Sequence, residues 1–190
     1  MPKVSDVVLT SSREESKEKP KVMINIDINF VYMDNIPKGH LTVMWNKLFK
    51  IAYDDECEYF FQCGDDIEFK TNGWVEDCIS KLQENNNIGL VGPVNNNPRI
   101  LTQSFVSKKH MELFGYYFPP EIINWFCDDW ITKVYYPEYF YQINNYIINV
   151  GGQPRYEVIG EIFNPNDPTF CACNRLIKSD RAKLQKCKAK

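Results

Sequence analysis

Two pairs of adjacent aspartates are the residues of this chain whose types and spacing best suit a chemical role. Asp65 and Asp66 follow the apolar run 59–63, and Gly64 stands directly before them. Adjacent carboxylates repel each other unless a cation lies between them, and Mg²⁺ or Mn²⁺ prefers oxygen ligands and leaves positions for phosphate. Ligands of open α/β sheets bind beyond the carboxyl ends of strands. We predict a divalent metal at Asp65 and Asp66. A loop whose acids cap the next helix stays open as the alternative.

The second pair, Asp128 and Asp129, lies among aromatic residues in the stretch NWFCDDWI. Burial of a carboxylate in such surroundings is costly unless a partner or a function offsets it. A general base must be a carboxylate or a histidine within reach of the acceptor hydroxyl. This pair is therefore a candidate for a catalytic base. The alternative is a pair of acids in the first turn of a helix, where the helix dipole favours negative charge.

The hydrophobic pattern predicts the elements that would position these acids. Residues 22–30 alternate as a strand, residues 42–53 have helical spacing, and residues 59–63 form an apolar strand that leads into the first aspartate pair. A helix over 73–83 and a short buried strand over 88–93 follow. This β-α-β-α-β order predicts an α/β fold with a single, mostly parallel sheet flanked by helices.

Further elements are expected in the second half of the chain. Residues 100–106 predict another strand, and Ser107 is a candidate cap for a short helix that ends at Phe114. A helical stretch opens at Pro119 and Pro120 and runs to Tyr135. The pattern of residues 139–150 fits a strand or a helix equally well.

Composition divides the chain into three parts. Residues 1–21 are mostly polar and charged and predict a disordered or linker segment. Residues 22–177 carry the predicted α/β domain. Residues 178–190 hold six basic residues and one acidic residue, and they predict a basic, frayed helical tail.

The bulk composition argues against several classes of function. A formal net charge of −3 gives no reason to expect a nucleic-acid ligand. The seven cysteines lack metal-site spacing and predict reduced, mostly buried thiols. The start of the chain resembles neither a signal peptide nor a membrane span, so we expect a cytoplasmic protein. His40 and His110 have no partner at metal spacing, and we expect both at the surface or in loops.

Together these motifs resemble the nucleotide-sugar glycosyltransferases of the GT-A fold, especially the family 2 type and related proteins of large DNA viruses and protists. The likeness covers roughly residues 33–149. Gly64-Asp65-Asp66 stands where that fold has its Asp-x-Asp motif. The resemblance implies that Asp66 binds Mn²⁺ or Mg²⁺ and that Asp65 contacts the metal or the ribose. It also implies that Asn46, which matches the Asn of an R-x-x-N-x-G-x-x-x-A stretch, lies with Gly64 at the donor site.

The resemblance further implies an inverting transfer from a UDP- or GDP-sugar to the hydroxyl of an unknown acceptor. Asp128-Asp129 matches the acid pair that lies near the acceptor in that family, so one of them would be the base. Gln103 falls in the strand that leads into the acceptor loop. Trp125 and Trp130 would form the sugar platform. A viral origin would place the protein in the host cytoplasm.

The N-terminus departs from the family pattern. Only about 20 residues precede the strand at Val22, so the β-α unit that binds the nucleotide base looks truncated, and Gly-Asp-Asp is not literally Asp-x-Asp. Two alternatives therefore stay open. One is a non-catalytic or truncated domain of the same fold that binds a sugar or a protein partner. The other is a different metal-dependent nucleotide enzyme, such as a nucleotidyltransferase, although the chain lacks a Gly-rich, basic phosphate loop.

Overall fold

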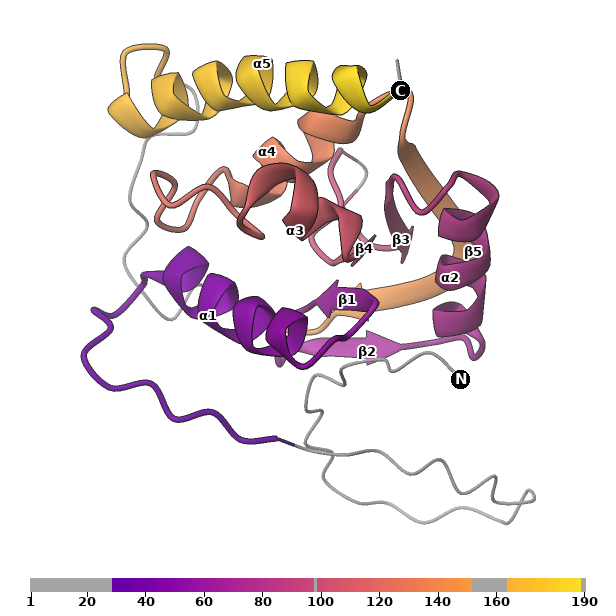
Figure 1. Ribbon diagram of the computed structural model, residues 1–190. Coiled ribbons are helices and arrows are strands. Elements are labelled where there is room, and N and C mark those ends of the chain that lie inside the picture. Colours follow the sequence, from indigo (N-terminus) through magenta and orange to yellow (C-terminus); the bar gives the residue numbers. More distant parts are fainter. Residues whose placement is uncertain (1–28, 98, 152–163, 189–190) are drawn as a thin grey trace.

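The computed structural model describes residues 29–97, 99–151 and 164–188 (Figure 1). The predicted segment 1–21 and most of the predicted strand 22–30 lie outside these residues. The described elements are α1 (Leu41–Asp54), β1 (Tyr59–Gln62), β2 (Ile67–Phe69), α2 (Trp74–Glu84), β3 (Leu90–Val94), β4 (Ser104–Ser107), α3 (Lys109–Phe114), α4 (Cys127–Tyr135), β5 (Phe140–Asn149) and α5 (Pro168–Lys188).

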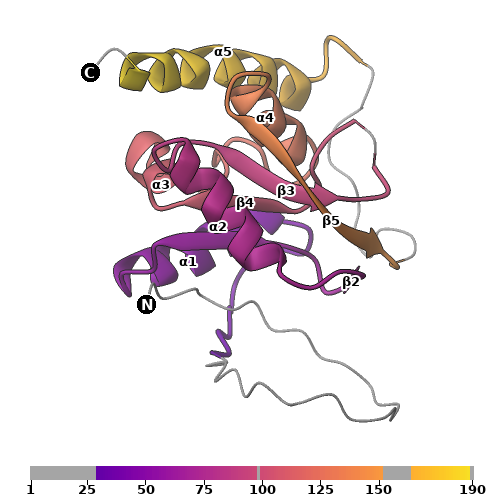
Figure 2. The same ribbon diagram turned by 90° about the vertical axis from the view of Figure 1, so that its right-hand side faces the viewer.

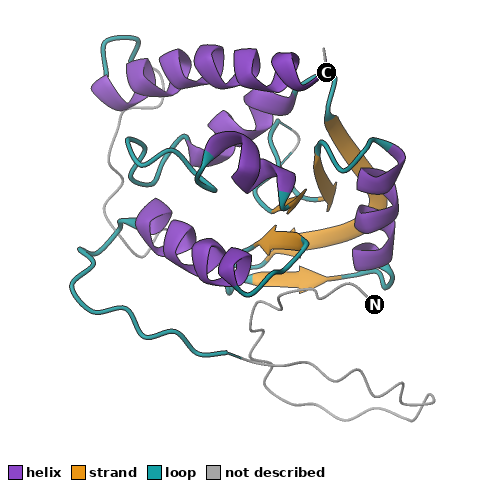
Figure 3. Ribbon diagram, in the orientation of Figure 1, coloured by secondary structure: helices purple, strands orange, loops and turns teal. Residues whose placement is uncertain are grey.

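The strands form one mixed sheet in the order β1-β4-β3-β5-β2 (Figure 3). β4 runs antiparallel to both β1 and β3, β3 and β5 are parallel, and β2 pairs antiparallel with β5. The α/β class is confirmed, but the expectation of a mostly parallel sheet is wrong. The physical reason lies in the connections: residues 95–103 join β3 to β4 without the crossover helix that a parallel neighbour needs.

Each face of the sheet has its own apolar core. Phe60 and Leu90 point to one face, and their chain neighbours Phe61 and Val91 point to the other, as the period of two in a strand requires. α2 covers the second face alone, whereas α1, α3 and α4 cover the first (Figures 1 and 2). α5 lies outside α3 and α4 as a further layer. β1, β3 and β4 are thus buried on both sides, which explains the apolar runs of β1 and β3, whereas β2 and β5 are partly exposed.

Local patterns predicted several elements correctly. The helices expected over 42–53 and 73–83 are α1 and α2, and the strand expected over 59–63 is β1. The ambiguous stretch 139–150 is the strand β5. The helix expected from Pro119 is wrong over its first half, because the described chain runs through turns to Phe126, whose φ of 72° is left-handed and interrupts a helix.

The C-terminal segment 178–188, predicted as a frayed tail, is part of the long helix α5. α5 continues without a break across residue 178, where composition suggested the start of a tail. Leu184 is buried against the core, and the Arg181 guanidinium donates a hydrogen bond to the carbonyl oxygen of Tyr136. Neither α5 nor any other helix within the described ranges is long and apolar enough to cross a membrane.

The seven cysteines form no disulfide within the described residues, and five of them are buried. The prediction that most of the thiols are buried is therefore confirmed. Only Cys171 and Cys187, both on α5, are exposed.

Candidate functional site

The candidate site lies at the edge of the sheet where β1, β3 and β5 end and where β2 and β4 begin. Gln62, at the end of β1, is paired with Ser104 at the start of β4. Ile67, at the start of β2, is paired with Asn149 at the end of β5. The turn that carries Asp65 and Asp66 therefore lies at the carboxyl edge, where side chains from several strands meet.

The first aspartate pair gives this edge a negative charge. Asp65 is exposed and Asp66 is half-buried. The backbone carbonyl of Asp66 accepts a hydrogen bond of 2.8 Å from the amide of Val150, which ties the turn to the end of β5. Burial raises the pKa of the adjacent Cys63 thiol to about 12, and the charges of Asp66 and Asp65 add to this increase. The thiol stays protonated, so the negative charge here belongs to the two carboxylates.

Carboxamide side chains organise the neighbouring loops at the same edge. The Asn95 amide donates to Gln103 Oε1 over 3.3 Å, and the Thr102 hydroxyl donates to the same oxygen over 2.9 Å. Asn96 and the backbone of Asn149 exchange two hydrogen bonds of 3.3 and 3.4 Å. Gln103, predicted to contact a sugar, is only 2% exposed, and its oxygen binds the loop.

A buried hydroxyl connects this edge to α4. The Tyr117 hydroxyl donates to the Ser104 carbonyl over 2.9 Å and lies 2.8 Å from Ser104 Oγ. Ser104 Oγ in turn donates to Gln62 Oε1 over 3.2 Å. Burial raises the pKa of Tyr117 well above its usual value, and the charges of Asp128 and Cys63 contribute to the rise. One tyrosine therefore lies within electrostatic reach of Asp128 and of the thiol beside the first aspartate pair.

The second aspartate pair splits into two environments at the start of α4. Burial, followed by the charge of Asp129, raises the pKa of the half-buried Asp128 to about 7. The Cys127 thiol donates a weak hydrogen bond of 3.8 Å to Asp128 Oδ1 and offsets part of this effect. Asp129 is also half-buried, and it pairs with Lys133 over 3.1 Å on the next turn of the helix. Asp128 alone combines partial burial with a pKa near neutrality, which suits a general base.

Trp130, predicted as part of a sugar platform, lies in the core. Its side chain is 0% exposed, and its Nε1 donates to Asp180 Oδ2 over 3.1 Å. The half-buried Tyr116 donates to the same carboxylate oxygen over 3.0 Å. Trp125 is also half-buried and packs against the same core. Of the two predicted tryptophans, only Trp125 keeps part of its surface open to solvent.

Asn46, predicted to contact the donor, joins α1 to the loop before α4. Its Oδ1 accepts hydrogen bonds of 2.9 Å from the backbone amides of Tyr117 and Phe118, and its Nδ2 donates to the Phe118 carbonyl over 2.7 Å. These three bonds use both ends of the carboxamide. The side chain thereby holds in place the loop that carries Tyr117.

His110 corrects an expectation, because it is buried rather than at the surface. Its Nε2 donates to the Tyr117 carbonyl over 2.9 Å, so its Nδ1 accepts from the Tyr135 hydroxyl, also over 2.9 Å. Burial lowers the pKa of His110 to about 4, which keeps the ring neutral. The sequence carried no signal for this network, because its members lie in different elements.

The donor groups at the sheet edge decide which metal ions would fit. Within the described residues, no three His, Cys, Asp or Glu side chains gather in a geometry that would hold a metal ion. Mg²⁺ is commonly bound through one or two carboxylates together with the phosphates of a substrate. Asp65 and Asp66 therefore fit a hard cation that binds together with a phosphate-containing ligand, and they do not fit a closed structural metal site.

Comparisons with protein-family models, with curated proteins and with solved structures gave no match. The likeness to glycosyltransferases therefore rests on the sequence motifs alone.

Proposed function

We propose that this protein is a metal-dependent glycosyltransferase that moves a sugar from a UDP- or GDP-sugar to an acceptor hydroxyl with inversion. The observation that carries this proposal is the environment of Asp128. Its pKa of about 7 suits a base at neutral pH. The charge of Asp128 also raises the pKa of Tyr117, and so does the charge of Cys63, which lies two residues before Asp65. Such a transfer requires a base and a cation site, and Asp128 and the first aspartate pair are the candidates for these two roles.

In this proposal the two aspartate pairs have separate tasks. Asp65 and Asp66 would hold the Mn²⁺ or Mg²⁺ ion, which would neutralise the charge that develops on the departing diphosphate. Asp128 would take the proton of the acceptor hydroxyl as that oxygen attacks the anomeric carbon from the opposite side. The hydrogen bonds among Gln62, Ser104 and Tyr117 would keep the end of β1 and the start of β4 rigid beside the first pair.

The surroundings suggest secondary roles. Trp125 remains the candidate for stacking against a sugar, because part of its surface is open. We do not assign Trp130 and Asn46 to ligands, because their side chains bind Asp180 and the loop at residues 117–118. The reduced thiols fit a reducing compartment, and we propose the cytoplasm.

Calorimetric titration of UDP and of GDP, with Mn²⁺ and then with EDTA, tests the donor site. Micromolar binding, equivalent to about −8 kcal/mol, that disappears with EDTA would support the proposal. Release of free nucleoside diphosphate from a nucleotide sugar would distinguish a glycosyltransferase from a nucleotidyltransferase, which releases pyrophosphate. Absence of nucleotide binding in all conditions would contradict the proposal.

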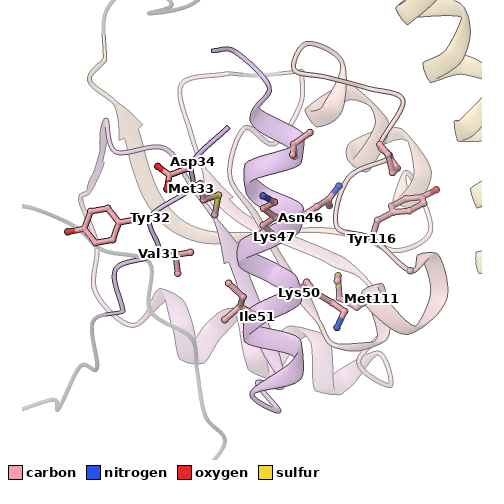
Figure 4. A pocket seen from close by; sticks show the side chains of 13 residues that line it. Val31, Tyr32, Met33, Asp34, Asn46, Lys47, Lys50, Ile51, Met111 and Tyr116 are labelled. Carbon is pink, nitrogen blue, oxygen red and sulfur yellow. The ribbon is translucent and has the colours of Figure 1, made fainter. Parts of the chain in front are cut away.

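A groove along α1 favours the alternative, a non-catalytic domain that binds a protein partner. The groove has a volume of about 660 Å³ and lies between the segment 31–34, α1 and the stretch that contains Met111 and Tyr116 (Figure 4). Apolar side chains are exposed around it, including Tyr32 at 90% and Ile51 at 49%. Exposed apolar surface of this kind is typical of interaction sites. Failure to bind nucleotide would therefore shift the proposal to this surface.

A further inference from the structure

Gly151 lies directly against the carboxylate of Asp66. A Cβ atom added at Gly151 would meet Asp66 Oδ2 at less than contact distance, and it would lie 2.6 Å from Asp66 Cγ and 2.8 Å from Asp66 Cβ. The carboxylate therefore fills the space that a side chain at position 151 would occupy. Gly64 borders the same group, because a Cβ added there would overlap Asp66 Oδ1.

Space, rather than backbone conformation, makes glycine necessary at position 151. The left-handed φ angles that favour glycine belong to Gly39, Gly73 and Gly115, and Gly151 is not among them. Other residues are therefore free to adopt its backbone conformation. What excludes them is the close approach of the Asp66 side chain.

Backbone contacts of the neighbouring residues keep Asp66 and Gly151 close together. Val150 donates its amide to the Asp66 carbonyl over 2.8 Å, and Ile67 pairs with Asn149 in the ladder between β2 and β5. Rotation about χ1 would move the Asp66 carboxylate away from a new side chain, but it would not move Asp66 Cβ. A larger residue at position 151 would therefore turn the carboxylate and also force the two backbones apart.

We infer that Gly151 is a positioning residue. Because it has no side chain, it leaves space for the Asp66 carboxylate in the orientation in which that carboxylate receives a cation. This inference rests on the proposed function, because that function makes Asp66 a metal ligand. Gly151 acts through Asp66 and contacts no substrate in this account. In the sequence, Gly151 stands two residues after the last residue of β5.

The first test is a titration of Mn²⁺ alone into the full chain, followed by the loss of the free Mn²⁺ signal in electron paramagnetic resonance. G151A is expected to bind Mn²⁺ about tenfold more weakly than wild type, as is usual when a group that orients a metal ligand is changed. V150A is the matched control, because Val150 is 59% exposed and its backbone hydrogen bond to Asp66 is unaffected by the change. Equal affinity of G151A and wild type would overturn the inference and leave the proposed function standing.

The second test does not depend on a metal. The substitution G151A is made both in the wild type and in the D66A variant, and the urea midpoint of unfolding is measured for each protein. In the wild type, G151A is expected to lower the midpoint clearly. In D66A it is expected to lower the midpoint much less, because the carboxyl that would clash with the new side chain is absent. An equal drop in both backgrounds, or no drop in either, would overturn the inference. If the wild type binds no Mn²⁺, either alone or in the presence of UDP or GDP, the proposed function fails, and this pair of measurements still decides whether Gly151 accommodates Asp66.

Discussion

Asp128 and Asp129 are adjacent in the chain, yet their carboxyls lie in opposite surroundings. Asp128 faces the interior beside the Cys127 thiol, and its pKa is raised to about 7 by burial and by the charge of Asp129. Asp129 is also half-buried, but it pairs with the Lys133 ammonium. The pair therefore supplies one group that titrates near neutral pH, Asp128, and one ion pair, that of Asp129 with Lys133. A substitution of either aspartate is a control for the same substitution of the other.

The raised pKa of Asp128 predicts how stability changes with pH. Its folded pKa lies above the ordinary value of 3.8, so the folded state binds more protons between pH 3.8 and 7, and stability falls as pH rises through this window. D128N removes this penalty and is expected to raise the free energy of unfolding at pH 8. The shift corresponds to at most about 4 kcal/mol, and water at this half-buried carboxyl reduces the gain. Urea unfolding between pH 4 and 8 measures the difference.

The comparison between variants is needed because His110 acts in the opposite direction. Its folded pKa of about 4 lies below the ordinary value of 6.5, so His110 makes the protein more stable as pH rises from 4 to 6.5. The difference between wild type and D128N isolates Asp128. If the two proteins show the same pH dependence, Asp128 does not titrate in this window.

The proposed base predicts a difference in transfer between the two aspartate variants. D128N is expected to slow the release of nucleoside diphosphate by about 10²- to 10⁴-fold while nucleotide affinity is unchanged. D129N is expected to keep most of the activity, because its carboxylate pairs with Lys133. Steady-state rates and nucleotide titrations of both variants measure this split. A larger loss in D129N would reassign the base.

The first aspartate pair predicts a loss of metal-dependent binding without loss of the fold. D66A is expected to abolish the part of UDP or GDP binding that needs Mn²⁺, because it removes a ligand of the ion. The fold should survive, since the backbone hydrogen bond from Val150 to Asp66 does not involve the side chain. D54A is a suitable control, because Asp54 is an exposed acid that pairs with Lys50 on α1. Unchanged nucleotide binding by D66A would separate this residue from the donor site.

Asn46 predicts a loss of stability rather than of ligand affinity. N46A leaves the backbone amides of Tyr117 and Phe118 without their acceptor, and it is expected to lower the free energy of unfolding by about 1 to 3 kcal/mol. K47A, on the exposed neighbour, is expected to change stability little. Chemical denaturation and nucleotide titration measure the two effects. A loss of nucleotide affinity at unchanged stability would restore the donor role that the sequence suggested.

Asp180 predicts that α5 is part of the stable fold. Its fully buried carboxylate accepts hydrogen bonds from Trp130 Nε1 and the Tyr116 hydroxyl, and its other oxygen lies 2.8 Å from the Lys183 ammonium. D180A leaves these donors unpaired and is expected to lower the free energy of unfolding by about 2 to 4 kcal/mol. K183A should cost less than about 1 kcal/mol, because the Lys183 side chain is 46% exposed. Equal effects of the two variants in urea unfolding would contradict this account.

Elements with a local apolar spacing could be predicted from the amino-acid sequence. The period of α1 and α2, and the apolar runs of β1 and β3, are properties of neighbouring residues, so they could be predicted before the fold was seen. The placement of Asp65 and Asp66 after a strand followed from the same reasoning. The carboxylate motifs were visible because their members are adjacent in the chain.

Only the tertiary structure decided the strand directions, the burial of single side chains and the contacts between distant segments. Trp125 and Trp130 have similar sequence surroundings, but Trp130 is fully buried because α5 brings Asp180 to its indole nitrogen. Asp66 meets Gly151 only because β2 pairs with β5, about 80 residues later in the chain. Such contacts depend on how the elements pack, and packing is not encoded in the spacing of any one segment.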